Sequence, residues 1–140
     1  MGVFTEKEIE YLRGQRLARV ATIGQNSTPH VVPVGFRVDA DATVIELGGH
    51  GLSQSKKWRD LKANPKVAVV VDDLASVQPW TPRGIEVRGQ AELHDEGGEK
   101  FGPGWDRAWI TIRPRRIVSW GINGPAFSPG GRSARTVQEE

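Results

Sequence analysis

The segment from Ser53 to Lys66 carries the clearest chemical signal of the chain, because cationic side chains gather where a helix is predicted to begin. Lys56, Lys57 and Arg59 occupy the first turns of that helix. A helix N-terminus already has partial positive charge and unpaired N–H groups, so cations there cost some stability. The same end of a helix favours a bound anion such as a phosphate. The segment therefore indicates either an anion site or a solvated basic face.

Spacing separates the basic residues of this helix from its apolar ones. Trp58 and Leu61 are three residues apart and are predicted to face the core, with Lys56 and Lys57 on either side of them. Lys62 continues the charged face and is interpreted as ordinary surface.

A glycine turn precedes the basic segment. Gly48 and Gly49 could form only a tight turn, which is the usual meaning of paired glycines. Alternatively, their missing side chains let a flat ligand or a phosphate approach the backbone. His50 is a candidate ligand contact beside this turn, whereas His30, just before a predicted strand, is interpreted as structural.

Trp80 lies between Pro79 and Pro82 in a predicted loop. A tryptophan in a loop needs a partner surface, which is either a ligand ring or another chain. Trp120 is interpreted as a core or dimer-interface residue.

Common catalytic patterns do not occur in the sequence. It has no nucleophile-elbow serine, no carboxylate pair typical of glycosidases and no His/Asp/Glu cluster with metal-ligand spacing. We therefore expect no metal site. An enzyme with this sequence would take its chemistry from a cofactor.

The elements that must position these residues are mostly strands. We predict a helix capped by Thr5 and ended near Gly14, and the basic helix ended by Asn64 and Pro65. Alternating or continuous apolar runs predict strands at 17–23, 30–38, 43–47, 67–71 and 84–93, with a last strand or strand pair at 109–112 and 116–122. Residues 72–82 are predicted to form a loop. Short strands with one internal helix predict a mainly β fold, a small antiparallel barrel.

Composition and charge limit the remaining possibilities. The 140 residues suit one domain, and the formal net charge of +2 gives no reason to expect nucleic-acid binding. No apolar run is long enough to cross a bilayer and no secretory signal is visible, so a cytoplasmic location without membrane contact is expected. We expect a domain over 1–122 and, over 123–140, a Pro/Gly/Ser-rich tail that is flexible or contacts a partner chain.

The ordered combination of several segments resembles the pyridoxamine 5'-phosphate oxidase-like superfamily, and within it the small branch that uses the deazaflavin F420. The matching segments are LARVATIG (17–24), PHVVPVGF (29–36), SKKWRDL (55–61), NPKVAV (64–69), GIEVRGQA (84–91) and IVSWG (117–121). The sequence departs from this pattern at Gly35, where many relatives have a bulky aromatic residue, and at Asp60, where many have Asn.

This resemblance implies a six-stranded antiparallel split β-barrel with short helices that forms a homodimer, with cofactor sites at the subunit interface. It implies coenzyme F420 as the cofactor, with FMN as the alternative. Carried over by position, the cofactor-binding residues would be Pro33, Val34 and Gly35 along the ring, Gly48, Gly49 and His50 near the ribityl chain, Ser55, Lys56 and Lys57 at the phosphate, and Trp80 and Arg83 from the partner chain.

The leading hypothesis is therefore an F420-dependent oxidoreductase that reduces an activated double bond of a small planar substrate. His50 is the nearby histidine that could donate a proton, and solvent is the alternative source. The rival hypotheses are an FMN-dependent oxidoreductase of the same fold, a non-catalytic F420- or flavin-binding protein and, against the overall charge, a nucleic-acid-binding protein.

Overall fold

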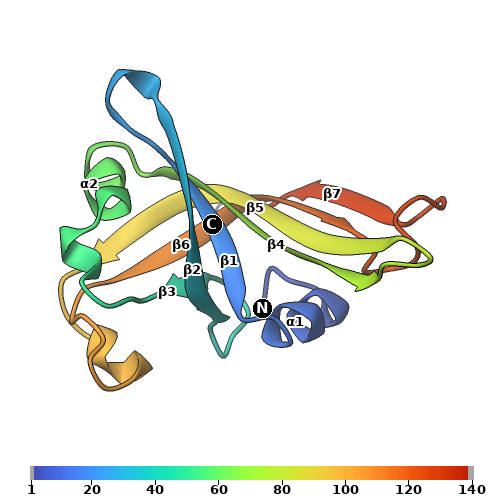
Figure 1. The fold of residues 1–140 in the computed structure, drawn as a ribbon, viewed down its shortest axis with the longest axis horizontal. Coiled ribbons are helices and arrows are strands. Elements are labelled where there is room, and N and C mark those ends of the chain that lie inside the picture. The colour runs from blue at the N-terminus through green and yellow to red at the C-terminus, as the bar shows by residue number, and fades with distance from the viewer. Residues whose placement is uncertain (1, 139–140) are drawn as a thin grey trace.

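Residues 2–138, which the computed structural model describes, form a mainly β structure with two α-helices (Figure 1). The helices are α1 (Glu6–Arg13) and α2 (Lys56–Ala63). Short 3-10 turns occur at Gln25–Ser27, Leu52–Gln54 and Gly98–Phe101. The strands are β1 (Leu17–Ile23), β2 (Pro29–Val38), β3 (Ile45–Leu47), β4 (Lys66–Ser76), β5 (Thr81–His94), β6 (Trp109–Trp120) and β7 (Arg132–Thr136).

The first six strands close an antiparallel barrel, as the sequence predicts. The hydrogen-bonded order is β3-β2-β1-β4-β5-β6-β7, and β3 also pairs with β6. Strand β6 pairs with two different strands along the same edge. Its residues Ile110–Ile112 pair with β3, and its residues Arg116–Trp120 pair with β7. The two predicted pieces of the last strand are thus one continuous element.

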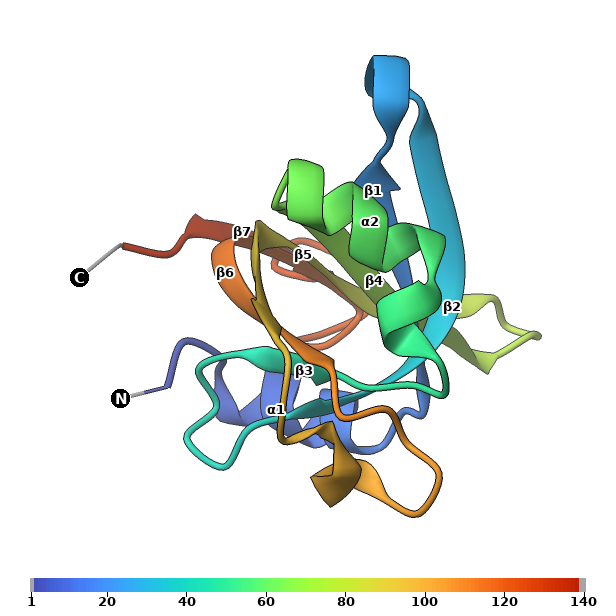
Figure 2. The same cartoon turned by 90° about the vertical axis from the view of Figure 1, so that its left-hand side faces the viewer.

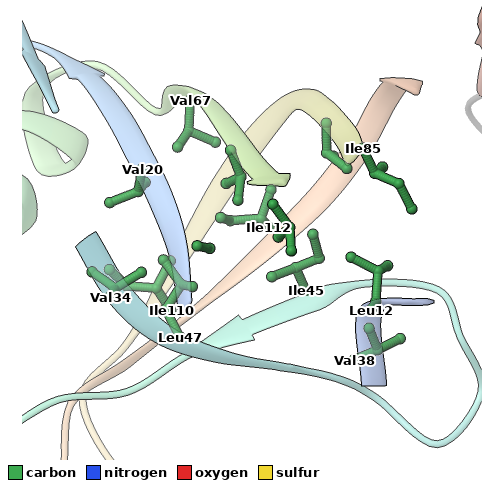
Figure 3. Close-up of a cluster of buried hydrophobic side chains, with 14 of the residues drawn as sticks. Leu12, Val20, Val34, Val38, Ile45, Leu47, Val67, Ile85, Ile110 and Ile112 are labelled. Atoms are coloured by element: carbon green, nitrogen blue, oxygen red, sulfur yellow. The ribbon is translucent and has the colours of Figure 1, made fainter. Parts of the chain in front are cut away.

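The barrel interior is apolar because alternate residues of each strand point inward. In β1, Ala18, Val20 and Thr22 are buried, whereas Leu17 and Arg19, which alternate with them, are exposed. Figure 3 shows inward side chains from several strands meeting in one cluster. Burying each Val, Leu or Ile side chain contributes roughly 1.5–3 kcal/mol, so this cluster is the main source of stability.

Both helices begin where the sequence predicts. Thr5 and Glu8 form a reciprocal capping box, with Glu8 N donating to Thr5 Oγ1 at 3.2 Å and Thr5 N donating to Glu8 Oε1 at 2.9 Å. Ser55 caps α2 by accepting from Trp58 N at 3.2 Å. Trp58 and Leu61 are buried, which holds α2 against the barrel at β1 and β5 (Figure 2).

The predicted loop at residues 72–82 is wrong. Strand β4 continues to Ser76 and β5 begins at Thr81, so a long hairpin leaves only residues 77–80 as its turn. The polar pair Asp72–Asp73 interrupts the apolar pattern, so the sequence does not indicate a strand there. In the structure, Asp73 lies opposite Arg83 on β5 and accepts two hydrogen bonds from its guanidinium, which explains a polar residue at this strand position.

The tail expected from Asn123 onward contains an ordered strand, since β7 pairs with β6. The inward side of this strand carries Arg135, whose guanidinium makes two hydrogen bonds to Glu8 of α1, at 2.6 Å and 2.9 Å. Glu8 is fully buried, so this ion pair ties the two ends of the described chain together. Residues 139 and 140 lie outside the described residues, and the domain boundary at 122 stays a prediction. Among residues 2–138, no helix is long and apolar enough to cross a membrane.

Replacing Arg135 by alanine should lower the free energy of unfolding by about 3 kcal/mol, because it leaves the buried Glu8 carboxylate without its cation. Urea denaturation measures this change. The matched control is Arg132→Ala on the exposed side of the same strand, which should change stability by less than about 0.5 kcal/mol. Equal effects of the two variants would contradict a stabilising role for the ion pair.

Candidate functional site

The glycine turn and the start of α2 are held by a second segment, residues 97–106, which we call the aromatic loop because it carries Phe101 and Trp105. Asp106 makes most of the connection. Its backbone N–H donates to Gly49 O at 2.9 Å, and its Oδ2 accepts from both Ser53 N at 3.0 Å and Ser53 Oγ at 2.7 Å. The turn before α2 and the aromatic loop therefore form one unit at the same end of the barrel (Figures 1 and 2).

Asp106 is an ionised acceptor in this unit. Hydrogen bonds from the backbone of Ser53, from the backbone of Ala108 and from the Ser53 hydroxyl hold the pKa of its carboxyl below the usual value. Sequence analysis missed this residue. The available signal was an Asp two positions before Ala108, a spacing at which Asp commonly accepts from the backbone, as Oδ1 does here at 3.0 Å.

His50 faces the aromatic loop. Its Nδ1 lies 2.7 Å from Gly104 O, and because a carbonyl can only accept, Nδ1 carries the hydrogen. The neutral ring consequently presents Nε2 as an acceptor, and only the imidazolium could donate a proton from Nε2. The ring also packs at a tilt against Trp105, with centroids 5.1 Å apart.

Trp105 covers the bare backbone at two glycines predicted to lie along the cofactor. A Cβ added to Gly48 would lie 3.0 Å from the Trp105 ring and 3.1 Å from Phe101, and one added to Gly35 would lie 3.8 Å from Trp105. The indole thus lies beside Gly35, within van der Waals contact of a Cβ built there. Like Trp80, Trp105 is a loop tryptophan that needs a partner surface, and it finds one in the glycine backbone and the His50 ring of its own chain.

Gly49 differs from Gly48, because the space beside it is open. A Cβ added there meets nothing closer than Leu52 Cβ at 3.9 Å. Of the paired glycines, Gly49 is therefore the one whose backbone a ligand could still approach.

The two lysines at the start of α2 have different surroundings. Lys56 is paired within the helix, since its Nζ donates to Asp60 Oδ1 at 2.9 Å and Oδ2 at 3.0 Å. Asp60 is buried and also accepts from Thr22 Oγ1 at 2.8 Å. Burial opposes ionisation of Asp60, but the hydrogen bonds from Lys56 and Thr22 outweigh it and lower the pKa of the carboxyl.

Lys57 is half-buried, and no carboxylate among residues 2–138 forms an ion pair with it. Burial lowers the pKa of its ammonium group, and no neighbouring charge acts against that shift. A partly desolvated cation without a counter-charge is stabilised when an anion from outside the chain joins it. Lys57 therefore fits an anion site better than Lys56 does.

Arg83 and Trp80 lie on the hairpin formed by β4 and β5. Arg83 binds Asp73 through two hydrogen bonds, at 2.7 Å and 2.9 Å, and its guanidinium lies 5.1 Å from the centre of the Tyr11 ring. Tyr11 also donates to Asp73 at 2.8 Å. Burial first, and then the bond to Asp73, raise the pKa of the Tyr11 phenol. Trp80 is 60% exposed in the hairpin turn, so the chain itself gives it little cover.

The ring-contacting segment predicted on β2 faces both sides of the barrel. Val34 points into the core and can offer only its backbone, whereas Pro33 is exposed on the outer face. Among the described residues, no group of three or more His, Cys, Asp or Glu side chains could hold a metal ion.

Comparison with known proteins places this fold and site in a family. Residues 4–120 match the model of the pyridoxamine 5'-phosphate oxidase family. The chain belongs to this family. The resemblance inferred from the ordered segments is thus confirmed.

Relatives within and near the family include named reductases. The chain is 42% identical over 137 residues to the 5a,11a-dehydrotetracycline/5a,11a-dehydrooxytetracycline reductase of Streptomyces rimosus, covering 98% of this chain and 95% of the relative. Among solved structures, an F420 reductase superposes with a TM-score of 0.60 at 25% identity, over 77% of this chain and 94% of that one. General stress protein 26 of Bacillus anthracis has a TM-score of 0.64 at 23% identity, covers 94% of this chain and 97% of its own, and shows the fold alone.

Replacing Asp60 by asparagine should destabilise the fold by about 2 kcal/mol at pH 6, since Lys56 and Thr22 lose an ionised acceptor. The folded-state pKa of Asp60 is lowered, so its contribution is fully present above the unfolded pKa of about 3.9 and is lost as pH falls through the folded pKa. The stability gap between wild type and Asp60→Asn should therefore narrow below about pH 4.

Denaturant titrations of both proteins from pH 6 to pH 3 measure this gap. Asp95→Asn is the control, because Asp95 is exposed and the substitution removes the same charge. A gap for Asp60→Asn that stays constant down to pH 3 would rule out the ionised pair.

Proposed function

We propose that this protein is an oxidoreductase that binds coenzyme F420 and reduces an activated double bond of a small planar substrate. The observation that carries the proposal is Lys57, a half-buried cation without a carboxylate partner at the start of α2. The 42% identical reductase and the structurally similar F420 reductase support an oxidoreductase. The family membership supports a deazaflavin or flavin cofactor.

The donors at this end of the barrel fit the phosphate of such a cofactor. Lys57 supplies a positive charge, and the first turn of α2 supplies N–H groups that have no partner within the helix. Gly49 leaves its backbone open beside them. Ser55 is already engaged, since its hydroxyl donates to Leu52 O at 2.7 Å and accepts from Trp58, so its part is to fix the turn.

The protein side of the reaction consists of binding, orientation and exclusion of water. When bound, the reduced deazaflavin supplies the hydride. Lys57 would hold the phosphate. The hydrogen bonds of Asp106 to Gly49 and Ser53 fix the turn beside which the cofactor would lie. His50 remains the candidate proton donor, acting as the imidazolium through Nε2, with solvent as the alternative.

We also propose that the functional form is a homodimer. The outer face of the sheet carries exposed apolar side chains on neighbouring strands, with Leu17, Val31 and Leu74 exposed by 54%, 64% and 39%. Trp80 extends beyond this face on the hairpin turn. A second copy of the chain would cover these side chains and bring Trp80 toward the other copy's site, while Arg83 stays fixed by Asp73 at the hairpin base.

Lys57→Ala should weaken F420 binding by about 1.5–3 kcal/mol, or roughly 10- to 150-fold, because a charge-assisted hydrogen bond to the phosphate is lost. Fluorescence titration of the cofactor measures the affinity. Lys62→Ala is the matched control, a lysine of the same helix that is exposed and lies in the last turn. It should leave the affinity within about twofold of wild type.

Three results would count against this function. Equal losses in Lys57→Ala and Lys62→Ala would mean general charge attraction. Binding of FMN without binding of F420 at micromolar cofactor would favour the flavin-dependent alternative. Tight F420 binding without oxidation of the reduced cofactor across quinones and enones would favour a binding protein.

Val31→Glu should convert the dimer to a monomer, because a dimer would bury the introduced charge in an apolar interface. Sedimentation velocity distinguishes the 15.4 kDa chain from its dimer. Ala63→Glu, on the exposed side of α2, adds the same charge elsewhere and should leave the dimer intact. A wild-type protein that sediments as a monomer would overturn the proposal.

A further inference from the structure

A pocket of about 360 Å³ lies between the aromatic loop, the start of β1 and the β2–β3 edge. Ligand sites for small molecules usually have volumes of about 300–1,000 Å³, so this one suits a ligand of a few fused rings. Its lining includes the backbone of Gly35 and Gly48, the rings of Phe101 and Trp105, and the side chains of Arg16 and Arg37.

Trp105 is fixed as one wall of this pocket. Its indole rests on Gly48, and it packs at a tilt against Phe101, with ring centroids 5.9 Å apart, and against His50. The hydrogen bond from Ser53 Oγ to the adjacent Asp106 holds the loop in place. Trp105 is nevertheless only half-buried, so part of its ring is left to face the pocket.

The rim of the pocket is cationic. Arg37 lies 4.3 Å from the centre of the Phe101 ring and is paired with Glu46 at 2.7 Å. Lys100 also lies 3.7 Å from Glu46, so the one lining carboxylate is shared between two cations. Arg16 has no ion-pair partner among residues 2–138 and is exposed at the pocket edge. The lining therefore has an excess of positive charge and one arginine available to an incoming anion.

We infer that this pocket binds a planar fused-ring anion, with Trp105 stacking on the rings and Arg16 binding the acidic group. A flat aromatic wall selects a flat ligand, and an arginine beside it selects a carboxylate or an enolate oxygen. The inference rests on the proposed function, because Gly35 and Gly48, which line this pocket, are among the residues that the family resemblance assigns to the cofactor. It makes Trp105 and Arg16 the residues that determine substrate specificity.

The test uses anthraquinone-2-carboxylate as a probe, with 2-(hydroxymethyl)anthraquinone as its uncharged analogue. Isothermal titration of the full-length protein, without reduced cofactor, measures both. Trp105→Ala should weaken both ligands by about tenfold, because stacking is lost whatever the charge. Arg16→Gln should weaken only the carboxylate, by about threefold, as expected for an exposed ion pair.

Two controls separate the site from general effects. Arg13→Gln removes the same charge three residues earlier, where Arg13 does not line the pocket, and should leave both affinities unchanged. Thermal melting checks that Trp105→Ala is folded. If that variant is unfolded, Trp105→Leu and the surface variant Arg16→Gln carry the test.

The experiment distinguishes a failure of this inference from a failure of the proposed function. Probe binding that depends on Trp105 and Arg16 supports the inference, even if F420 titrated in parallel does not bind. A wild type that binds F420 but not the probe at millimolar concentration overturns the inference and leaves the cofactor proposal intact. Probe binding that neither variant weakens also overturns it.

Discussion

Closure of the barrel by β3 determines where the glycine turn and the aromatic loop lie. This strand has only three residues, Ile45–Leu47, yet it pairs with β2 on one side and β6 on the other. Because β3 and β6 are antiparallel with Leu47 opposite Ile110, the chain that leaves β3 and the chain that enters β6 meet at the same end of the barrel. The glycine turn and the aromatic loop are therefore neighbours by topology, and the buried Leu47 and Ile110 hold them there.

The two lysines at the start of α2 have different roles, because only one of them is paired with a carboxylate. Asp60 lies one turn after Lys56 and neutralises it, while its bond to Thr22 anchors α2 to β1. No carboxylate among the described residues pairs with Lys57, so its ammonium group is available to an anion from outside the chain. One cation of the basic segment thus stabilises the fold, and its neighbour is available for a ligand.

Local signals predicted much of this arrangement. The capping box of Thr5 and Glu8, the strand at 17–23 and the buried pair Trp58 and Leu61 depend on residues close in sequence, and the structure has all three. Sequence reasoning failed where contacts between residues far apart in the chain determine the local structure. Strand β7 forms because β6 has a free edge beyond β3 and Arg135 reaches Glu8, and neither cause is visible in a Pro/Gly-rich tail. The contact of Trp105 with Gly35 and Gly48 likewise depends on barrel closure, so the sequence does not indicate that the aromatic loop covers part of both glycines.

The most direct test of the central claim, that the start of α2 holds a cofactor phosphate through Lys57, is a crystal structure of the protein with F420 bound. The account predicts a phosphate oxygen about 2.7–2.9 Å from Lys57 Nζ, the distance of a charge-assisted hydrogen bond, with Lys56 still on Asp60. A phosphate seated instead in the neighbouring cavity lined by Asn26, Lys56 and Arg59, with no anion at Lys57, would contradict it.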